Sequence, residues 1–343
     1  RAAAACAAYE VLKHLYPGQS DMLDARLAQS LGAISDGAAK DLGVAYGAVV
    51  GQACINNRAN DNHDVVYPYT PGDQPGQWRP TPPANDPAWG PGWSNVTPWV
   101  MAAPDQFRPE APPALGSAED AESFNRGKEL GALNSATRTA DQTEFAMFWA
   151  NDRDGTSKPP GHWNQIAQTI AAQEGNTLLQ NARMYAILNV AMADTAISVW
   201  DAKYAYELWR PLTGIREADS DGNDLTISDP TWQPLADALP YPNTPAFPAY
   251  TSGHATFGST AATILALFFG SDDIAFSIGS DELEGVVRHF TSLSQAAQEN
   301  ADSRMYLGVH WDFATEIGLL QGQALGQYIF DNFLVIPAPS GAA

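Results

Sequence analysis

The chain has 343 residues, of which 45% are hydrophobic and 17% are charged, and its formal net charge at pH 7 is −21. This length allows one large domain or two smaller ones, and the strong negative charge argues against nucleic acid or anionic membranes as partners. No run approaches the ~20 apolar residues of a membrane-spanning helix. Cys6 and Cys54 are too few for a disulfide framework, although they could link two N-terminal helices.

Helical periodicity dominates the chain, and few stretches show the period of two that is typical of a strand. The segments predicted to be helical are 3–15, 21–34, 37–56, 118–130, 142–150, 163–172, 177–193, 256–269, 282–297 and 314–332. The fold class that this pattern predicts is all-α, with the helices packed as a bundle.

Residues 58–115 are the exception to this helical pattern. They carry 13 of the 25 prolines together with Trp78, Trp89, Trp93 and Trp99. A linker of this length would ordinarily be disordered, but disordered segments are poor in aromatic residues. We therefore expect an ordered coil that wraps over the bundle and lines a substrate entrance.

An acidic run at residues 217–224 has the spacing of a calcium-binding loop. However, Glu217 stands where such a loop begins with Asp, and Ser228 stands where a bidentate Glu should close it. We therefore interpret the run as a polar turn between helices.

Two cations define the first motif that carries chemistry. Lys203 and Arg210 are seven residues apart in a segment without Gly or Pro, and Pro211 follows directly. If the segment is helical, both side chains lie on one face, and Pro211 ends the helix just beyond Arg210. Most such pairs form only a solvated stripe, but the surrounding aromatic residues make that reading less favourable here.

The second motif is Ser252-Gly253-His254, between a Pro-rich loop and an apolar run typical of a buried helix. The free N–H groups of a helix start, with a capping hydroxyl, form an anion-binding site, and Gly253 would allow the anion close approach. Taken alone, Ser252 is an ordinary helix cap and His254 an ordinary first-turn histidine.

The third motif places Arg304 and His310 on either side of Gly308. A guanidinium suits bidentate binding of a tetrahedral oxyanion, and a neutral imidazole can attack or coordinate its central atom. Three buried cations in so acidic a chain would be costly without a counterion. The three motifs together therefore predict a site for a small, highly charged anion.

Lys-x6-Arg-Pro, Ser-Gly-His and Ser-Arg-x3-Gly-x-His, in this order, resemble the signature of the type 2 phosphatidic acid phosphatase and vanadium-dependent haloperoxidase superfamily. The likeness is to the bacterial haloperoxidase branch and extends from about residue 138 to the C-terminal helix. It implies two four-helix-bundle-like halves within one helical domain spanning 1–343, with the catalytic core at 138–335.

The resemblance also implies a role for each site residue. Vanadate would be the cofactor, with phosphate able to occupy the same site, and His310 would be the ligand to the metal. Binding of the anion is implied for Lys203, Arg210, Ser252, Gly253 and Arg304. Catalytic roles are implied for His254 as the acid–base group, for Lys203 and for Asp152. The halide pocket would include Phe247 and Trp200.

The function implied is oxidation of a halide by hydrogen peroxide to a hypohalous-acid-type species that halogenates a small organic acceptor. One alternative is a soluble acid phosphatase with His310 as phospho-acceptor, and another is a non-catalytic oxyanion-binding protein. The phosphatases carry an Asp four residues after this histidine, whereas the chain has Ala314 there and its nearest carboxylate is Asp312. Because a nucleophilic histidine needs such a partner, this departure favours the peroxidase.

The N-terminal sequence, Arg-Ala-Ala-Ala-Ala-Cys, has the character of a helix already under way, and no targeting signal is visible in it. We expect a secreted or otherwise extracytoplasmic protein. The halide, the organic acceptor and the oligomeric state stay open at this level.

Overall fold

The computed structural model describes residues 1–241 and 244–335, which form two compact units. The smaller unit contains residues 1–64 and 177–182, and the larger contains 65–176 and the residues from 183 onward. Helices dominate the described residues of both units, so the predicted all-α class is confirmed. The expectation of one domain over the whole chain stays a prediction.

The smaller unit consists mainly of three helices, α1 (Ala2–Leu15), α2 (Ser20–Gly32) and α3 (Ala38–Arg58), with a 3₁₀ turn at Pro17–Gln19. The first and third helices approach closely at Gly47, where an added Cβ would lie 2.4 Å from the Ala3 carbonyl oxygen. Cys6 is buried and Cys54 is partly buried, and both are free thiols.

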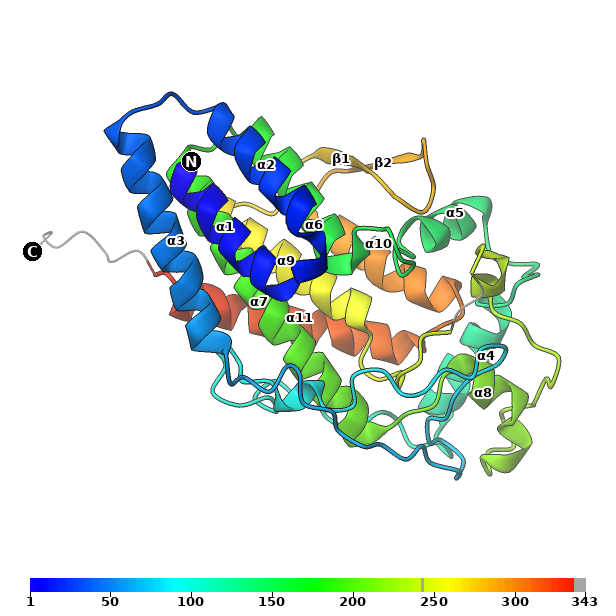
Figure 1. Cartoon of the computed structure of the whole chain (residues 1–343). Coiled ribbons are helices and arrows are strands. Elements are labelled where there is room, and N and C mark those ends of the chain that lie inside the picture. The colour runs from blue at the N-terminus through cyan, green and yellow to red at the C-terminus, as the bar shows by residue number, and fades with distance from the viewer. Residues whose placement is uncertain (242–243, 336–343) are drawn as a thin grey trace, which may run out of the picture. The chain divides into compact units, whose positions relative to one another are not determined.

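The larger unit is a bundle built around α9, which is flanked by α10 and α11 (Figure 1). Its helices are α4 (Ala118–Leu130), α5 (Ala140–Phe148), α6 (Lys158–Gln173), α7 (Leu178–Tyr206) from residue 183 onward, α8 (Pro211–Arg216), α9 (Gly253–Phe269), α10 (Leu293–Tyr306) and α11 (Asp312–Asn332). Short 3₁₀ turns lie at Trp93–Asn95, Ala218–Ser220 and Leu235–Ala238.

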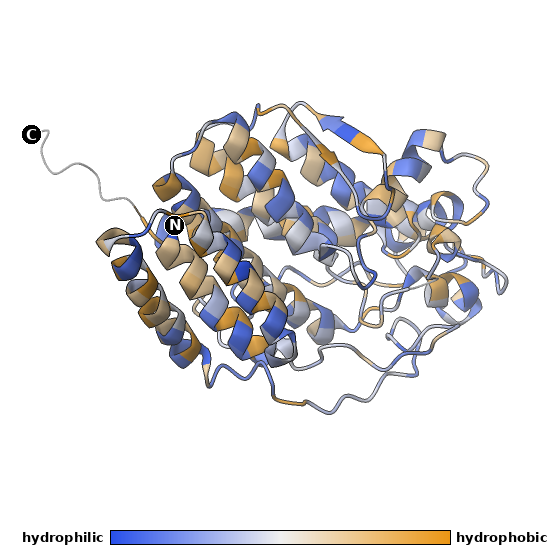
Figure 2. Cartoon of the chain, turned by 45° about the horizontal axis from the view of Figure 1, so that its top comes forward, coloured by the Kyte–Doolittle hydropathy of each residue, from blue (hydrophilic) through white to orange (hydrophobic). Residues whose placement is uncertain are grey.

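Small residues bring α9 and α11 together. At Gly322 an added Cβ would be 2.4 Å from the Thr256 carbonyl oxygen, so the two backbones are nearly in contact. Trp163, Ile166 and Met184 are among the fully buried residues of the surrounding core. Hydrophobic and hydrophilic residues alternate around the helices in Figure 2, as expected for helices that bury one face. No helix among the described residues is long and apolar enough to cross a membrane.

The predicted helix at 282–297 is wrong in its first half. The chain forms a hairpin there, with β1 (Phe276–Gly279) antiparallel to β2 (Val287–Phe290), and α10 begins only at Leu293. Gly285, with a φ of +84°, lies in the hairpin turn and interrupts any helix.

The helical placement of Lys203 and Arg210 on one face is also wrong. The long helix α7 ends at Tyr206, and Pro211 occupies the first position of α8 instead of ending a helix. Proline fits this position because the first helical N–H has no partner in any case. Arg210 is therefore the extended residue just before α8.

From residue 65 onward, the Pro/Trp-rich coil packs against the C-terminal half of α7; it is cyan in Figure 1. Its expected place at a substrate entrance stays a prediction. The Asp194 carboxylate, fully buried in α7, accepts the backbone N–H groups of Trp99, Val100 and Met101 at 2.6, 2.8 and 2.9 Å. Arg108 donates two hydrogen bonds of 2.6 and 2.7 Å to Asp201. Two aspartates of one helix thus hold the coil in place.

Candidate functional site

Three cations from separate elements meet inside the larger unit. Lys203 lies in the last turn of α7, Arg210 precedes α8, and Arg304 lies in the last turn of α10. Their exposures are 0%, 0% and 1%. Burying three positive side chains together is strongly unfavourable unless anionic groups compensate them.

The hydrogen bonds of these cations leave donors unused. Lys203 Nζ donates to the carbonyls of Pro248 and Thr251 at 3.0 and 2.6 Å. Arg210 donates through Nε to Phe247 O at 2.7 Å and through Nη1 to Val309 O at 2.8 Å, and its Nη2 has no partner.

Arg304 has one carboxylate partner, Asp152, which accepts from Nη2 at 3.0 Å. Its Nε and Nη1 are buried without a hydrogen-bond partner. A planar guanidinium with two unused donors is suited to two oxygens of one tetrahedral anion.

Burial and mutual repulsion shift the pKa values of the cations in this cluster. Burial lowers the pKa of Lys203 well below its usual value, and the charges of Arg210 and Arg304 lower it further. Burial, followed by repulsion from Arg304, lowers the pKa of Arg210 to about 9. A bound anion would reverse the repulsive part of both shifts.

His310 lies beside these cations. Gly308, with a φ of +78°, turns the chain after α10, and the backbone N–H of His310 donates to the Arg304 carbonyl at 3.3 Å. Arg210 Nη1 lies 3.1 Å from His310 Nε2. Because a guanidinium can only donate, Nε2 carries the lone pair and Nδ1 the proton, and the buried Nδ1 has no partner. Burial and the neighbouring cations hold the pKa of His310 well below its usual value, so the ring is neutral.

His254 is also neutral. Burial, together with the charge of Arg304, lowers its pKa to about 3. Its Nε2 lies 3.1 Å from the Ala150 carbonyl oxygen, which can only accept, so Nε2 carries the proton and Nδ1 the lone pair. Asp152 Oδ1 lies 3.9 Å from the same Nε2. The 150–152 segment therefore contacts both His254 and Arg304.

The start of α9 supplies uncharged donors. Ser252 caps this helix, and its hydroxyl oxygen accepts the Ala255 N–H at 3.5 Å, which leaves the hydroxyl hydrogen free to donate. A Cβ added to Gly253 would meet only a Phe257 ring atom, at 4.0 Å. There is accordingly open space on the Cβ side of Gly253, which allows close approach to the start of this helix.

Aromatic rings border the cations on another side. The Phe247 ring lies 4.9 Å from Lys203 Nζ and 4.7 Å from the Arg210 guanidinium carbon. Trp200 packs on Phe247 with ring centroids 5.0 Å apart. A third ring, Trp89, lies 5.6 Å from Trp200 and 6.0 Å from Phe247.

The nearest carboxylate of the signature faces elsewhere. One Asp312 oxygen accepts from the Ser123 hydroxyl, and the other accepts from Arg126 Nη1 at 3.2 Å. Ala314, where the phosphatases carry Asp, is fully buried within an apolar cluster that includes Trp311. Among the described residues, no carboxylate is hydrogen-bonded to the His310 ring.

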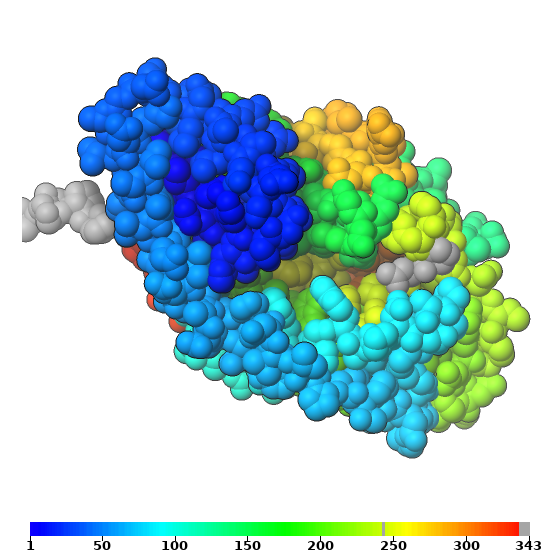
Figure 3. Space-filling model, in the orientation of Figure 1, coloured from blue at the N-terminus to red at the C-terminus, as the bar shows by residue number. Residues whose placement is uncertain are grey.

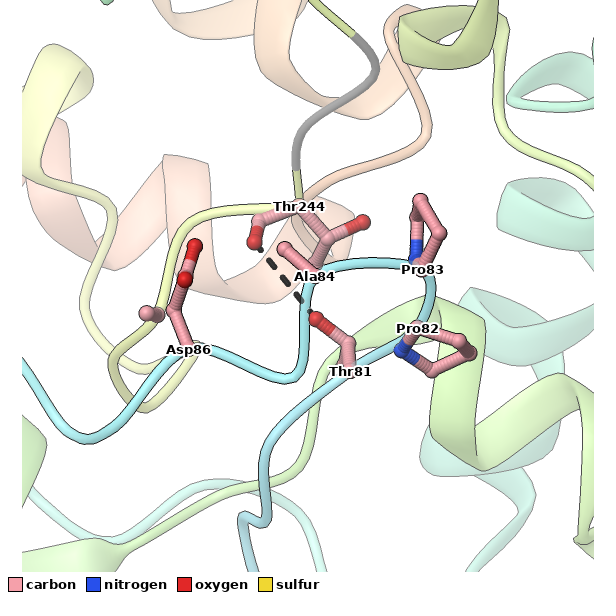
Figure 4. Close-up of a pocket in the computed structure, with 7 residues that line it drawn as sticks. Thr81, Pro82, Pro83, Ala84, Asp86 and Thr244 are labelled. Atoms are coloured by element: carbon pink, nitrogen blue, oxygen red, sulfur yellow. Dashed lines mark hydrogen bonds between the residues drawn. The ribbon is translucent and has the colours of Figure 1, made fainter.

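The surface between the Pro/Trp-rich coil and the residues near 150–160 is concave. Figure 3 shows a hollow between the cyan Pro/Trp-rich coil and the green residues near 150–160, with yellow and red atoms at its floor. Residues from the 81–86 stretch of the coil and Thr244 line a small pocket, where the Thr81 hydroxyl donates to the Thr244 carbonyl at 3.5 Å (Figure 4). A larger cavity of about 320 Å³ adjoins Pro82 and Pro83. Neither pocket includes a residue of the cation cluster.

The acidic run at 217–224 contains the 3₁₀ turn at Ala218–Ser220. No group of three or more His, Cys, Asp or Glu side chains that could hold a metal ion occurs in the part of the chain that the structure describes.

Comparisons with known proteins place this geometry in a family. The family model described as the VCPO second helical-bundle domain matches residues 183–336. Vanadium chloroperoxidase of Curvularia inaequalis is 34% identical over 232 residues, which are 53% of this chain and 37% of that protein's length.

Among solved structures, a bacterial vanadium-dependent iodoperoxidase superposes with a TM-score of 0.81 at 30% identity, over 97% of this chain and 78% of the other. A holo-type bacterial vanadium-dependent chloroperoxidase gives a TM-score of 0.72 at 17% identity, over 96% of this chain and 81% of the other, which shows the shared fold. The chain belongs to the vanadium-dependent haloperoxidase family.

The structure brings Lys203, Arg210, Arg304 and His310 together, with Asp152 and His254 beside Arg304, and with Phe247 and Trp200 beside Lys203. Ser252 and Gly253 directly follow Thr251, whose carbonyl accepts from Lys203. What sequence reasoning missed is Trp89, which was noted only as part of the Pro/Trp-rich coil, and the backbone carbonyls that hold Lys203 and His254. Contacts made through carbonyls leave no sequence signal, because every residue has one. Trp89 had a usable signal, since it is a large aromatic residue beside Gly90 in a coil expected to line an entrance.

Proposed function

We propose that this protein is a vanadate-dependent haloperoxidase that oxidises a halide with hydrogen peroxide. The observation that carries the proposal is the buried cluster of Lys203, Arg210 and Arg304 beside His310. Arg210 Nη2, two Arg304 nitrogens and His310 Nδ1 are buried there without a partner. Buried polar atoms are normally satisfied, so these orphaned donors support a resident oxyanion.

The residues present fit vanadate. The three cations would balance its negative charge, and the Ser252 hydroxyl and the Gly253 N–H would donate to its oxygens. His310 Nε2, which carries the lone pair of the ring, would be the metal ligand once Arg210 donates to the anion instead. When bound, vanadate supplies a pentavalent Lewis acid that activates hydrogen peroxide toward halide.

His254 is proposed as the acid–base group. Its Nε2–H is held by the Ala150 carbonyl, so Nδ1 is the atom that takes up and returns a proton. Its pKa is lowered to about 3 by burial and the charge of Arg304. Negative charge at the site raises the pKa toward neutrality, so His254 gains its proton-transfer role only with the anion in place. Asp152 positions Arg304 and lies near His254.

The overall reaction balances as halide plus hydrogen peroxide plus a proton giving hypohalous acid and water. The halide loses two electrons, and the peroxide O–O bond breaks as it accepts them. Lys203 would stabilise the negative charge that develops on the departing oxygen. Phe247 and Trp200 would form the halide pocket, since their rings border the cations and exclude water.

A soluble phosphatase is the second candidate, because phosphate and vanadate have nearly the same shape and charge. Such an enzyme needs a carboxylate to activate His310 as a nucleophile. Asp312 is engaged by Ser123 and Arg126. The absence of this partner favours the peroxidase. A purely oxyanion-binding protein would have no use for His254 beside the anion.

The test measures halogenation of a diketone dye substrate with chloride, bromide and iodide, with and without orthovanadate, beside hydrolysis of a phosphate ester. We expect vanadate-dependent halogenation and slow ester hydrolysis. His254→Ala should retain vanadate and lose most turnover, whereas His310→Ala should lose the bound metal itself. Brisk phosphatase activity that vanadate inhibits, with no halogenation at any pH, would establish the second candidate.

An extracytoplasmic location is part of the same proposal. It is supported by a substrate chemistry that generates a freely reactive oxidant. Fractionation of the native cells with an antibody against this chain tests it, and a purely cytoplasmic signal would contradict it.

A further inference from the structure

Trp89 is held in position by its backbone. Its N–H donates to the Ala246 carbonyl at 2.8 Å, and its own carbonyl accepts from Tyr204 Oη at 2.7 Å and from Trp200 Nε1 at 3.3 Å. The next residue, Gly90, has a φ of +69°, and an added Cβ would lie 2.5 Å from Trp200 Nε1. The coil is therefore pressed against the Trp200 indole at this point.

The Trp89 side chain is nevertheless 64% exposed, whereas Trp200 is 8% exposed. A single exposed hydrophobic residue needs no explanation by itself. Here, however, the exposed ring belongs to a contiguous trio with Trp200 and Phe247. Phe247 in turn lies over Lys203 and Arg210. The trio forms a series of ring contacts that runs from the exposed Trp89 to the cation cluster.

We propose that Trp89 is a binding platform for a planar, electron-rich aromatic acceptor, such as a phenol or an indole, that the enzyme halogenates. This inference rests on the proposed haloperoxidase function and names the class of its organic substrate. Aromatic rings pair with one another in offset or edge-to-face geometry, beyond the gain from burial alone. An acceptor on Trp89 would lie two ring contacts from Lys203, close to where the oxidant forms.

The chemistry of such an acceptor balances without a further co-reactant. The ring C–H bond breaks and a C–halogen bond forms, and the released proton joins the hydroxide of hypohalous acid as water. The two electrons that the halide lost to peroxide return to it from the ring carbon. Electron-rich rings react most readily, and a fixed platform would raise their local concentration over that of other acceptors.

The first experiment measures binding without turnover. Saturation-transfer difference NMR follows 2-naphthol against the full-length protein loaded with orthovanadate, with no peroxide or halide present. We expect Trp89→Leu, which keeps apolar bulk and all three backbone hydrogen bonds, to weaken binding at least fivefold, and Trp89→Phe to weaken it less. Trp93→Leu is the matched control, because Trp93 is in the same coil, is 37% exposed and lies outside the aromatic trio.

The second experiment gives the protein 2-naphthol and a non-aromatic diketone together with peroxide and halide. The ratio of naphthol to diketone halogenation should fall at least threefold in Trp89→Leu and stay at the parent value in Trp93→Leu. Equal binding of 2-naphthol by the parent and Trp89→Leu, or no binding by the parent, would overturn the platform. If no halide is oxidised, the proposed function fails, whereas the binding result still decides whether Trp89 holds aromatic ligands.

Discussion

Arg304 is the cation whose removal tests the oxyanion site most directly. It is 1% exposed, and its Nε and Nη1 have no partner within the protein. A hydrogen bond to a charged group contributes about 1.5–3 kcal/mol. Two such bonds to the anion predict that Arg304→Ala weakens vanadate binding by on the order of 3 kcal/mol, or roughly 150-fold in Kd.

The assay is isothermal titration calorimetry of anion-free protein with orthovanadate in a buffer without phosphate. Arg304→Lys should be intermediate, because it restores the charge but not the planar pair of donors. Arg288→Gln is the control, since Arg288 is also largely buried but binds Glu299 and Asp141 away from the site. If folded Arg304→Ala binds vanadate within threefold of the parent, the proposed pocket is wrong.

Three further outcomes are expected. Orthovanadate or phosphate should raise the melting temperature of anion-free protein. At an anion concentration of a hundred times Kd, the free energy of unfolding should rise by about 2.7 kcal/mol. An unchanged melting temperature with both anions would contradict the site. Asp194→Asn should lower the unfolding free energy by roughly 3 kcal/mol, because it weakens three charge-assisted bonds to the coil; an unchanged urea midpoint would refute this. Burial and the charge of Asp221 raise the pKa of Asp120 to about 7. Between about pH 4 and pH 7, the folded protein therefore holds a proton on Asp120 that the unfolded protein has released. The free energy of unfolding consequently falls as the pH rises through this range. Asp120→Asn should therefore melt at a higher temperature than the parent at pH 8 but not at pH 4, and parallel melting curves at both pH values would contradict the shift.

Much of the helical content could be predicted from periodicity, and the errors have local causes. The hairpin at 276–290 was missed because the residues from 282 to 297 follow a helical pattern of polar and apolar residues. Gly285 adopts a positive φ and turns the chain into the second strand, so the helix starts only after the hairpin. The end of α7 was misplaced because Pro211 is compatible with both the end and the start of a helix. Backbone bonds to residues distant in sequence show which applies. Trp209 N–H donates to the Gly76 carbonyl, and the Glu207 carbonyl accepts from Trp78 N–H.

The candidate site could be predicted in its residue types but not in its protonation. Short motifs name Lys203, Arg210, Arg304 and the two histidines, since these side chains carry the chemistry. Which ring nitrogen holds the proton depends on contacts such as that of His254 with the Ala150 carbonyl. That contact depends on the tertiary path of the 150–152 segment, which no local pattern encodes.

The helix α7 fixes the distance and the angle between the coil and the cation cluster. Asp194 and Asp201 are seven residues apart and share the face that holds residues 99–108 of the coil. Lys203, nine residues after Asp194, points about 180° away from Asp194. Inserting one residue between Asp194 and Lys203 would rotate Lys203 by about 100° and shift it by ~1.5 Å relative to the coil. Lys203 would then no longer face Arg210 and Arg304 while Asp194 still binds the coil. Engineered changes in chain length therefore belong in the surface turns, because this stretch works as a fixed spacer with no tolerance for an added or missing residue.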